Sequence, residues 1–224
     1  MIALIDNDII LKLGKWDLFS ELIYLLGGDV GCIYRLKSCL YVLCDPKHPG
    51  KALKRCGDQA TIDRITDFYN RTSPIPTPRE PTWLERLNNI PEIDVGEVLI
   101  FAVGLEEDVS ITYLGDKRSL VALGNTVTLA NAVKILAGRT KCLEQVIAEI
   151  VASYGFEHVL LKIRSRPDAD KAMNYIFGTR PHCRQPMEIW DGLLSYYNDL
   201  KEKTNGLLAP YPDMPISHEP QKAL

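Results

Sequence analysis

Short apolar segments that alternate with helix-like segments constrain the fold of this chain most strongly. Residues 1–5 are almost all apolar, which is typical of a strand that is buried on both faces of a parallel sheet. The sequence then predicts a strand at 110–114, a short helix at 117–123 and a further strand at 126–129. Strands separated by helices indicate βαβ units, so we expect an α/β fold with a central parallel sheet.

Helical periodicity occupies much of the remaining chain. Apolar residues recur at near-helical spacing over 9–26, after which Gly27 and Gly28 stop the helix. Further helices are predicted over 60–70, 95–107, 130–151 and 187–203. The proline-rich stretch 73–81 interrupts the pattern, because proline lacks the N–H that a regular helix or a central strand requires. We interpret this stretch as a surface excursion within one domain.

These elements predict one domain over residues 1–208. We divide it into a core at 1–26 and 91–150, a helical insertion at 28–89 and a helical C-terminal section at 151–208. The last segment, 209–224, is rich in proline and poor in apolar side chains, so a flexible tail is expected. The C-terminal helices could form the interface of a homodimer, the expected oligomer, or cover the enlarged core.

The bulk composition is that of an ordinary globular protein, with 46% hydrophobic and 25% charged residues in 224 positions. The N-terminus begins with a strand-like run rather than a basic segment, and no apolar run approaches the roughly 20 residues of a membrane span. We therefore expect a cytoplasmic protein that makes no membrane contact. The six cysteines form no CxxC pair, and the spacing of Cys44, His48 and Cys56 matches no common zinc pattern, which favours reduced thiols.

Acidic residues follow the predicted strands and open the predicted helices. Asp6 comes directly after the first strand, and Asp116 follows the strand at 110–114. Asp94 and Glu97 open the helix over 95–107. In an open parallel sheet, ligands bind beyond the carboxyl ends of the strands. Carboxylates gathered there are what an oxygen-ligated Mg²⁺ or Mn²⁺ ion requires.

Helix capping is the alternative interpretation of the same residues. Asp94 is a plausible N-cap with Glu97 three residues later, as in a capping box, and Asp116 can cap the helix at 117–123. Capping explains Asp6 less well, because Asp6 interrupts an apolar strand and is followed by Asn7 and Asp8. Convergent carboxylates without a cation would also repel one another and raise one another's pKa.

In order and spacing, three acidic segments resemble the signature of the PIN-domain family, which includes the VapC-type toxins. The segments are Asp6-Asn7-Asp8, Asp94-Val95-Gly96-Glu97 and Gly115-Asp116-Lys117-Arg118, and the similar regions are 1–26 and 91–129. The resemblance implies a three-layer α/β/α sandwich and a nuclease that depends on Mg²⁺ or Mn²⁺ and cleaves RNA in many members. It also implies a catalytic set of Asp6, Asp94, Glu97 and Asp116.

Within that set, the resemblance assigns Asp6, Glu97 and Asp116 as metal ligands. Glu97 could instead orient the attacking water. The family's usual fourth acid is not evident, since residues 124–137 contain no Asp or Glu. Asn125 or Asn131 could supply a neutral ligand in its place, or Asp94 or Asp8 could complete the set.

The formal net charge of the chain is −3, so the protein as a whole does not attract nucleic acid. Any contact with nucleic acid must therefore come from a local basic patch. The region 134–184 holds nine basic and five acidic residues. The candidate contacts are Lys162, Arg164 and Arg166 in this region and Lys117 and Arg118 beside Asp116. A solvated helix face is the alternative for the first three.

The sequence therefore predicts a metal-dependent endoribonuclease, with DNA as a further possible substrate. The rival hypothesis is a non-catalytic PIN-like module that binds a protein partner, such as an antitoxin, in a defence or toxin–antitoxin assembly.

Overall fold

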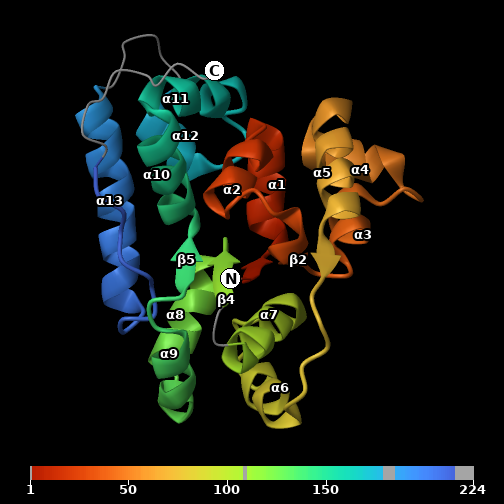
Figure 1. Ribbon diagram of the computed structural model, residues 1–224, viewed down its shortest axis with the longest axis vertical. Coiled ribbons are helices and arrows are strands. Elements are labelled where there is room, and N and C mark those ends of the chain that lie inside the picture. Colours follow the sequence, from red (N-terminus) through yellow and green to blue (C-terminus); the bar gives the residue numbers. More distant parts are fainter. Residues whose placement is uncertain (1, 108–109, 179–184, 215–224) are drawn as a thin grey trace.

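A sheet of five parallel strands forms the centre of the molecule (Figure 1). The computed structural model describes residues 2–107, 110–178 and 185–214. The strands are β1 (Ile2–Ile5), β2 (Ile33–Arg35), β3 (Ser73–Pro74), β4 (Ser110–Leu114) and β5 (Thr140–Cys142). They lie in the order β3-β2-β1-β4-β5, and each neighbouring pair is parallel. The predicted α/β fold with a central parallel sheet is therefore confirmed.

Strand β1 is buried on both faces because its residues alternate between two cores. Ala3 and Ile5 pack in one cluster of apolar side chains, and Leu4 packs in the other. Successive side chains of a strand point to opposite faces of the sheet, so helices must cover both sides. This arrangement is consistent with the predicted three-layer α/β/α sandwich.

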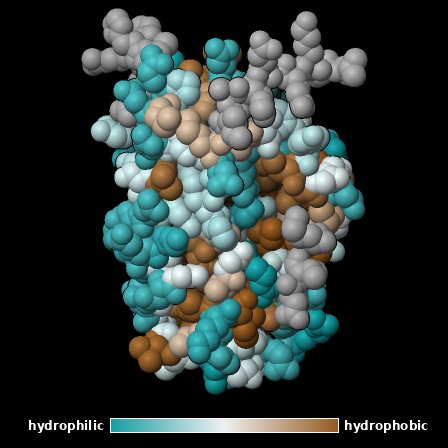
Figure 2. All heavy atoms as spheres, turned by 60° about the vertical axis from the view of Figure 1, so that its left-hand side comes forward, coloured by the Kyte–Doolittle hydropathy of each residue, from teal (hydrophilic) through white to brown (hydrophobic). Residues whose placement is uncertain are grey.

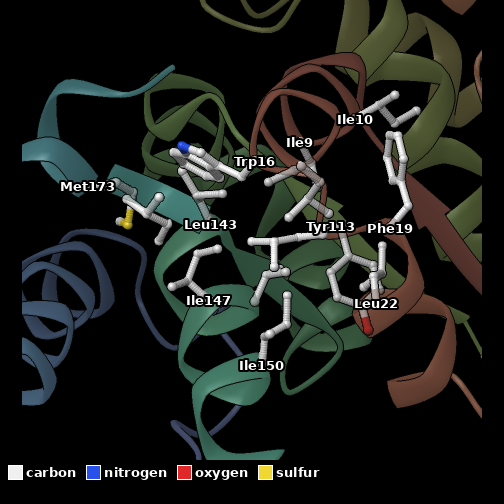
Figure 3. Packing of buried hydrophobic residues seen from close by; sticks show 14 of the residues in the cluster. Ile9, Ile10, Trp16, Phe19, Leu22, Tyr113, Leu143, Ile147, Ile150 and Met173 are labelled. Carbon is white, nitrogen blue, oxygen red and sulfur yellow. The ribbon is translucent and has the colours of Figure 1, made fainter. Parts of the chain in front are cut away.

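The larger core lies on the face that carries the N-terminal helices and those after β5. The helices here are α1 (Asn7–Trp16), α2 (Phe19–Leu25), α10 (Leu143–Tyr154), α11 (Phe156–Ser165) and α12 (Lys171–Phe177). Figure 3 shows Trp16, Tyr113 and Met173 among apolar residues of α1, α2 and α10. Beside β2, the same core is extended by α3 (Cys39–Cys44), α4 (Pro49–Cys56) and α5 (Gln59–Arg71) (Figure 1).

The second core lies on the opposite face of the sheet. It is covered by α6 (Pro81–Asn88), α7 (Val95–Glu106), α8 (Lys117–Asn125) and α9 (Ala130–Leu136). The last helix, α13 (Pro186–Lys203), reaches both cores, with Trp190 in the first and Leu200 in the second. Helix α13 thus covers the enlarged core, and Figure 2 shows hydrophilic and hydrophobic side chains intermixed on this side of the molecule.

The helix predicted over 9–26 is broken into α1 and α2. Helix α1 ends at Asp17, which adopts a left-handed conformation with φ of 56°, and its N–H closes the helix on Gly14 and Leu13. Aspartate tolerates this conformation better than most residues, because its short side chain can bond locally. The break lets Leu18 and Phe19 both enter the core.

The predicted strand at 126–129 and the predicted single helix over 130–151 are both wrong. A 3₁₀ turn occupies Val127–Leu129, and the fifth strand lies at Thr140–Cys142, between α9 and α10. Gly138, with φ of 76°, turns the chain after α9, and β5 then pairs with β4. Sequence periodicity missed this strand because it is three residues long and contains Lys141.

Residues 28–89 are not a separate insertion, because this segment supplies β2 and β3 to the central sheet. Its helical character is as expected, with α3, α4, α5 and α6. The proline-rich stretch provides β3 at the edge of the sheet, where a strand needs only one partner. The Ile75 N–H then donates to the Arg35 carbonyl oxygen at 2.8 Å.

The segment predicted as a tail, 209–224, begins packed rather than loose. The Ala209 N–H donates to Thr140 O at 2.8 Å, and Tyr197 donates to Ala209 O at 2.9 Å. Tyr211 packs against Trp190 and Tyr197. The rest of the predicted tail, from residue 215 on, lies outside the described residues.

The thiols of Cys44 and Cys56 lie 3.5 Å apart, and both cysteines are free. His48, which the zinc alternative would need, bonds to Asp45 instead. Within the described ranges, no single helix is long and apolar enough to cross a membrane, although α8 and the segment 127–136 pass together as a pair bent by 85°.

Candidate active site

The carboxyl ends of β1, β2 and β4 meet at one edge of the sheet, where a pocket of about 670 Å³ opens. Five acidic side chains line it: Asp6, Asp8, Asp94, Glu97 and Asp116. Its other walls include Asn7, Leu36, Ser38 and Val42. The structure therefore brings the four predicted catalytic residues and Asp8 together from three distant parts of the sequence. Asn125 and Asn131, the neutral alternatives, do not line this pocket.

Helix capping fixes where these carboxylates lie. Asp6 caps α1 by accepting the Asn7 N–H at 2.6 Å, and Asp116 caps α8 by accepting the Arg118 N–H at 2.8 Å. Asp94 and Glu97 form the predicted capping box of α7, with both N···O distances at 2.9 Å. The capping alternative is therefore correct for all three helices, and it also explains how the acids reach one place. Each helix N-terminus, with roughly half a positive charge, offsets the carboxylate charges only in part.

Asp6 and Glu97 are the most buried acids of the pocket, with 7% and 3% of their surfaces exposed. Burial raises the pKa of Asp6 to about 6, and the charge of Asp8 adds to the rise, while N–H bonds from Asn7 and Asp8 oppose it. Burial also raises the pKa of Glu97 to about 7, opposed by the Asp94 N–H and assisted by the charges of Asp94 and Asp6. The ionised form of both carboxylates is thus less stable in the pocket than it would be in water.

Of the acids in the pocket, only those at its edge form ion pairs with the described basic side chains. Arg118 binds Asp116 at 2.6 Å and lowers the pKa of that carboxyl. Lys12 lies 2.6 Å from Asp8. Among the described residues, no basic side chain forms an ion pair with Asp6, Asp94 or Glu97. The centre of the pocket therefore carries acidic charge without a cationic partner.

Two glycines let the walls of the pocket approach one another closely. A Cβ on Gly115 would lie 2.0 Å from Oδ2 of Asp8, and a Cβ on Gly96 would lie 2.7 Å from Cδ1 of Leu36. Neither space can hold a methyl group unless a neighbour shifts. Asp8 is thus held against the backbone that leads from β4 to Asp116.

The donor chemistry of the pocket fits a hard divalent cation, which prefers carboxylate and carbonyl oxygens. Asn7 adds a buried Oδ1 atom that has no hydrogen-bond partner. In the part of the chain that the structure describes, no three His, Cys, Asp or Glu side chains are arranged as a ready metal site. Caps and the Arg118 ion pair occupy several of the oxygens, so binding an ion would require these side chains to move.

The predicted nucleic-acid contacts fall into two groups. Arg118 is 83% exposed at the pocket, and Lys117, next to it, bonds to the buried Glu144 at 2.5 Å. Lys162, Arg164 and Arg166 lie elsewhere, near the C-terminal end of α1, where Trp16 donates to the Arg166 carbonyl. Asp6 caps the other end of this ten-residue helix, roughly 15 Å away at 1.5 Å per residue.

Internal contacts occupy the three distant residues. Lys162 binds Glu21 at 2.9 Å, Arg166 binds Asp58 at 2.5 Å, and Arg164 donates to the Phe177 carbonyl at 2.9 and 3.1 Å. The structure thus gives them a role in holding α11 to its neighbours rather than in contacting a strand at the pocket. All three are partly buried rather than on a fully solvated face, and their contact with nucleic acid stays a prediction.

The walls formed by Ser38 and Val42 were missed by sequence reasoning. They follow β2, in a segment whose apolar residues suit helix and strand equally well. One signal was available, because a loop that follows a strand next to β1 must reach the same edge of a parallel sheet.

Comparison with protein-family models, with curated proteins and with solved structures gave no match for this chain. The fold and the pocket therefore have to carry the functional argument on their own.

Proposed function

We propose that the chain is a metal-dependent nuclease with a PIN-like fold that acts on RNA as an endonuclease. The observation that carries the proposal is the centre of the pocket, where Asp6, Asp94 and Glu97 come together without a cationic partner among the described residues. Asp6 and Glu97 are buried there, and buried like charges repel and cost free energy unless a cation lies between them. A divalent ion would supply that cation.

Asp6, Glu97 and Asp116 would hold the ion, with Asp94 or Asp8 completing the set. When bound, Mg²⁺ or Mn²⁺ polarises a phosphate oxygen and lowers the pKa of a bound water molecule. The raised pKa values of Asp6 and Glu97 belong to the metal-free pocket, and a bound cation would lower both. If Asp94 or Asp8 ligated the ion in its place, Glu97 could instead orient the attacking water.

Asp116 has to leave Arg118 before it can bind an ion. The pair costs little to break, because Arg118 is 83% exposed and solvent screens surface ion pairs. The released guanidinium would remain beside the pocket, where it can bind a phosphate oxygen of the substrate. Arg118 is therefore proposed as a switchable partner of Asp116 and of the scissile phosphate.

The choice of RNA over DNA rests on the family resemblance alone. The test is cleavage of labelled single-stranded RNA and DNA with Mn²⁺, by the natural protein and by Asp6→Asn. Asp199→Asn on α13, which removes an exposed carboxylate from a surface ion pair, is the matched control. We expect cleavage by the natural protein and by the control, and none by Asp6→Asn. Equal cleavage by all three would reject the proposal.

The rival is a non-catalytic, PIN-like module that binds a protein such as an antitoxin. It is favoured by the caps, because Asp6, Asp94, Glu97 and Asp116 all have a structural role without metal. The two proposals differ over whether a charge-removing, cap-preserving substitution matters. If the rival is correct, Asp6→Asn changes neither the effect of metal on the stability of the protein nor its activity toward RNA.

A further inference from the structure

A second charged surface lies next to the acidic pocket, on α3 and α4. Residues 37–55 contain five basic side chains and one acidic side chain, Asp45, in a chain whose formal net charge is −3. The basic residues are Lys37, Lys47, Lys51, Lys54 and Arg55, and all are exposed. This segment is therefore locally cationic on an acidic protein.

These five cations differ from most others in the molecule. Lys15, Lys117 and Arg166 lie within ion-pair distance of carboxylates, whereas none of the five does so in the described ranges. Arg55 donates to the carbonyl of Val42 and so ties α4 to α3. An unpaired cation keeps its full charge for a ligand, so this surface is suited to a polyanion.

The surface is hollowed, and both apolar and basic side chains line the hollow. A groove of about 750 Å³ lies between α3 and α4, lined by Tyr41, Val42, His48, Lys51, Lys54 and Arg55. Its one carboxylate in the described part of the chain, Asp45, is bonded to His48 at 2.6 Å. Tyr41 is 60% exposed and Val42 is 42% exposed. Cations along a groove together with an exposed aromatic ring form the combination that binds single-stranded nucleic acid, through phosphates and base stacking.

The groove and the acidic pocket share one wall residue. Val42 lines both, and α3 and α4 stand beside β2 at one side of the sheet (Figure 1). On α4, Lys51, Lys54 and Arg55 share one face because they are three and four residues apart, while Ala52 and Cys56 are buried. A strand held on that face would pass Tyr41 and Val42 to reach Asp6 and Glu97.

We propose that the groove between α3 and α4 binds a single-stranded polynucleotide and leads it into the acidic pocket. This inference rests on the proposed nuclease function and names its substrate path. Lys51, Lys54 and Arg55 contact phosphates, and the Tyr41 ring stacks on a base. These contacts replace the role that sequence reasoning gave to Lys162, Arg164 and Arg166.

The test is fluorescence anisotropy with labelled 12-nucleotide RNA and DNA strands in EDTA, so that binding is measured without cleavage. We compare Lys51→Ala/Lys54→Ala with Lys134→Ala/Lys171→Ala, a control pair of exposed lysines on α9 and α12. For single strands, each phosphate contact contributes about −0.7 to the slope of log K against log salt. Losing two contacts should therefore make the slope of Lys51→Ala/Lys54→Ala less negative by about 1.4. The control pair should keep both the affinity and the slope.

Tyr41 provides a second and independent readout. Tyr41→Ala should weaken binding by at least about fivefold, and Tyr41→Phe, which keeps the ring, should not. Thermal melting checks that each variant folds. Unchanged affinity in both Lys51→Ala/Lys54→Ala and Tyr41→Ala would overturn the proposal that the groove binds a strand. Binding to anionic vesicles without binding to either oligonucleotide would overturn it as well.

The groove and the nuclease can fail separately. Strand binding that depends on the groove in a protein that never cleaves supports the groove and rejects the nuclease. Cleavage that depends on Asp6 but ignores Lys51, Lys54 and Tyr41 supports the nuclease and rejects the groove.

Discussion

The two ends of α1 carry many charged side chains but use them differently. At the N-terminal end, Asp6, Asp94 and Glu97 gather in one pocket without an ion-pair partner among the described residues. At the C-terminal end, the charges are paired: Lys15 with Asp168, Lys162 with Glu21 and Arg166 with Asp58, at 3.0, 2.9 and 2.5 Å. Pairing, rather than the number of charges, distinguishes a candidate site from a scaffold.

The largest effect is expected from Glu97→Gln. Glutamine keeps the capping box with Asp94, since its side-chain oxygen can still accept the Asp94 N–H, but it removes the charge. Metal ions supply several kcal/mol to phosphoryl chemistry, so losing a ligand should reduce RNA cleavage by more than about a hundredfold. Cleavage rates with Mn²⁺ and thermal melting measure the two effects. Full activity with an intact fold would show that Glu97 is only a cap.

The matched substitution at the other end of α1 is Glu21→Gln. It removes a charge that is 5% exposed and bound to Lys162 and His158, and it leaves Lys162 with Asp17 as its only ion-pair partner among the described residues. We expect a loss of about 2–3 kcal/mol in the free energy of unfolding, measured in urea, and unchanged cleavage per folded molecule. A drop in cleavage without a drop in stability would remove the distinction between the two ends.

The pH dependence of stability should have opposite signs at the two ends. The pKa values of Asp6 and Glu97 are raised to about 6 and about 7, so the folded protein keeps protons that the unfolded chain releases. Their contribution to stability is therefore present below about pH 4 and is lost as pH rises to about 7. Burial raises the pKa of Glu21, but bonds from Lys162 and His158 outweigh it and lower the pKa. Its contribution is present at neutral pH and is lost as pH falls.

Urea unfolding of metal-free protein between pH 4.5 and 8 measures these signs. At pH 8, Asp6→Asn should be more stable than the natural protein by about 2 kcal/mol, because the asparagine carries no charge to bury. This difference should shrink toward pH 4.5. A constant difference across the range would mean that Asp6 does not titrate as its burial implies.

The smallest effect is expected from Arg118→Ala. The Arg118–Asp116 pair is exposed and screened by solvent, so stability should hardly change. Without Arg118, Asp116 is free for an ion, and Mn²⁺ affinity should rise by up to about fivefold in calorimetry. Cleavage should nevertheless fall if the guanidinium binds the scissile phosphate. Weaker Mn²⁺ binding in this variant would contradict the switchable role of Arg118.

The sequence was most informative where one signal decides the structure. The apolar run at β1, the capping box of Asp94 and Glu97, and Asp116 after β4 each place an acid beyond the carboxyl end of a strand or at the start of a helix. The topology of a parallel sheet then brings these places together. The acidic pocket was predictable for this reason.

The sequence was least informative where tertiary contacts decide. Strand β5 is three residues long and polar in the middle, and its neighbour β4 defines it rather than any periodicity. Charge counts likewise placed nucleic-acid contacts on α11, because a sequence does not show that Glu21 and Asp58 would take Lys162 and Arg166. The cations of α4 were visible in the sequence, but only the structure shows that they form no ion pair with the described residues and lie next to the pocket.

Thermal melting at pH 7.5 with and without millimolar Mn²⁺ tests the central claim, that the acids of the pocket form a metal site, most directly. A ligand well above its Kd stabilises the folded state by RT ln(1 + [L]/Kd), so Mn²⁺ should raise the melting temperature of the natural protein. Asp6→Asn should melt at a higher temperature than the natural protein without metal and should gain nothing from Mn²⁺. The same Mn²⁺ response in both proteins, or none in either, would contradict the claim.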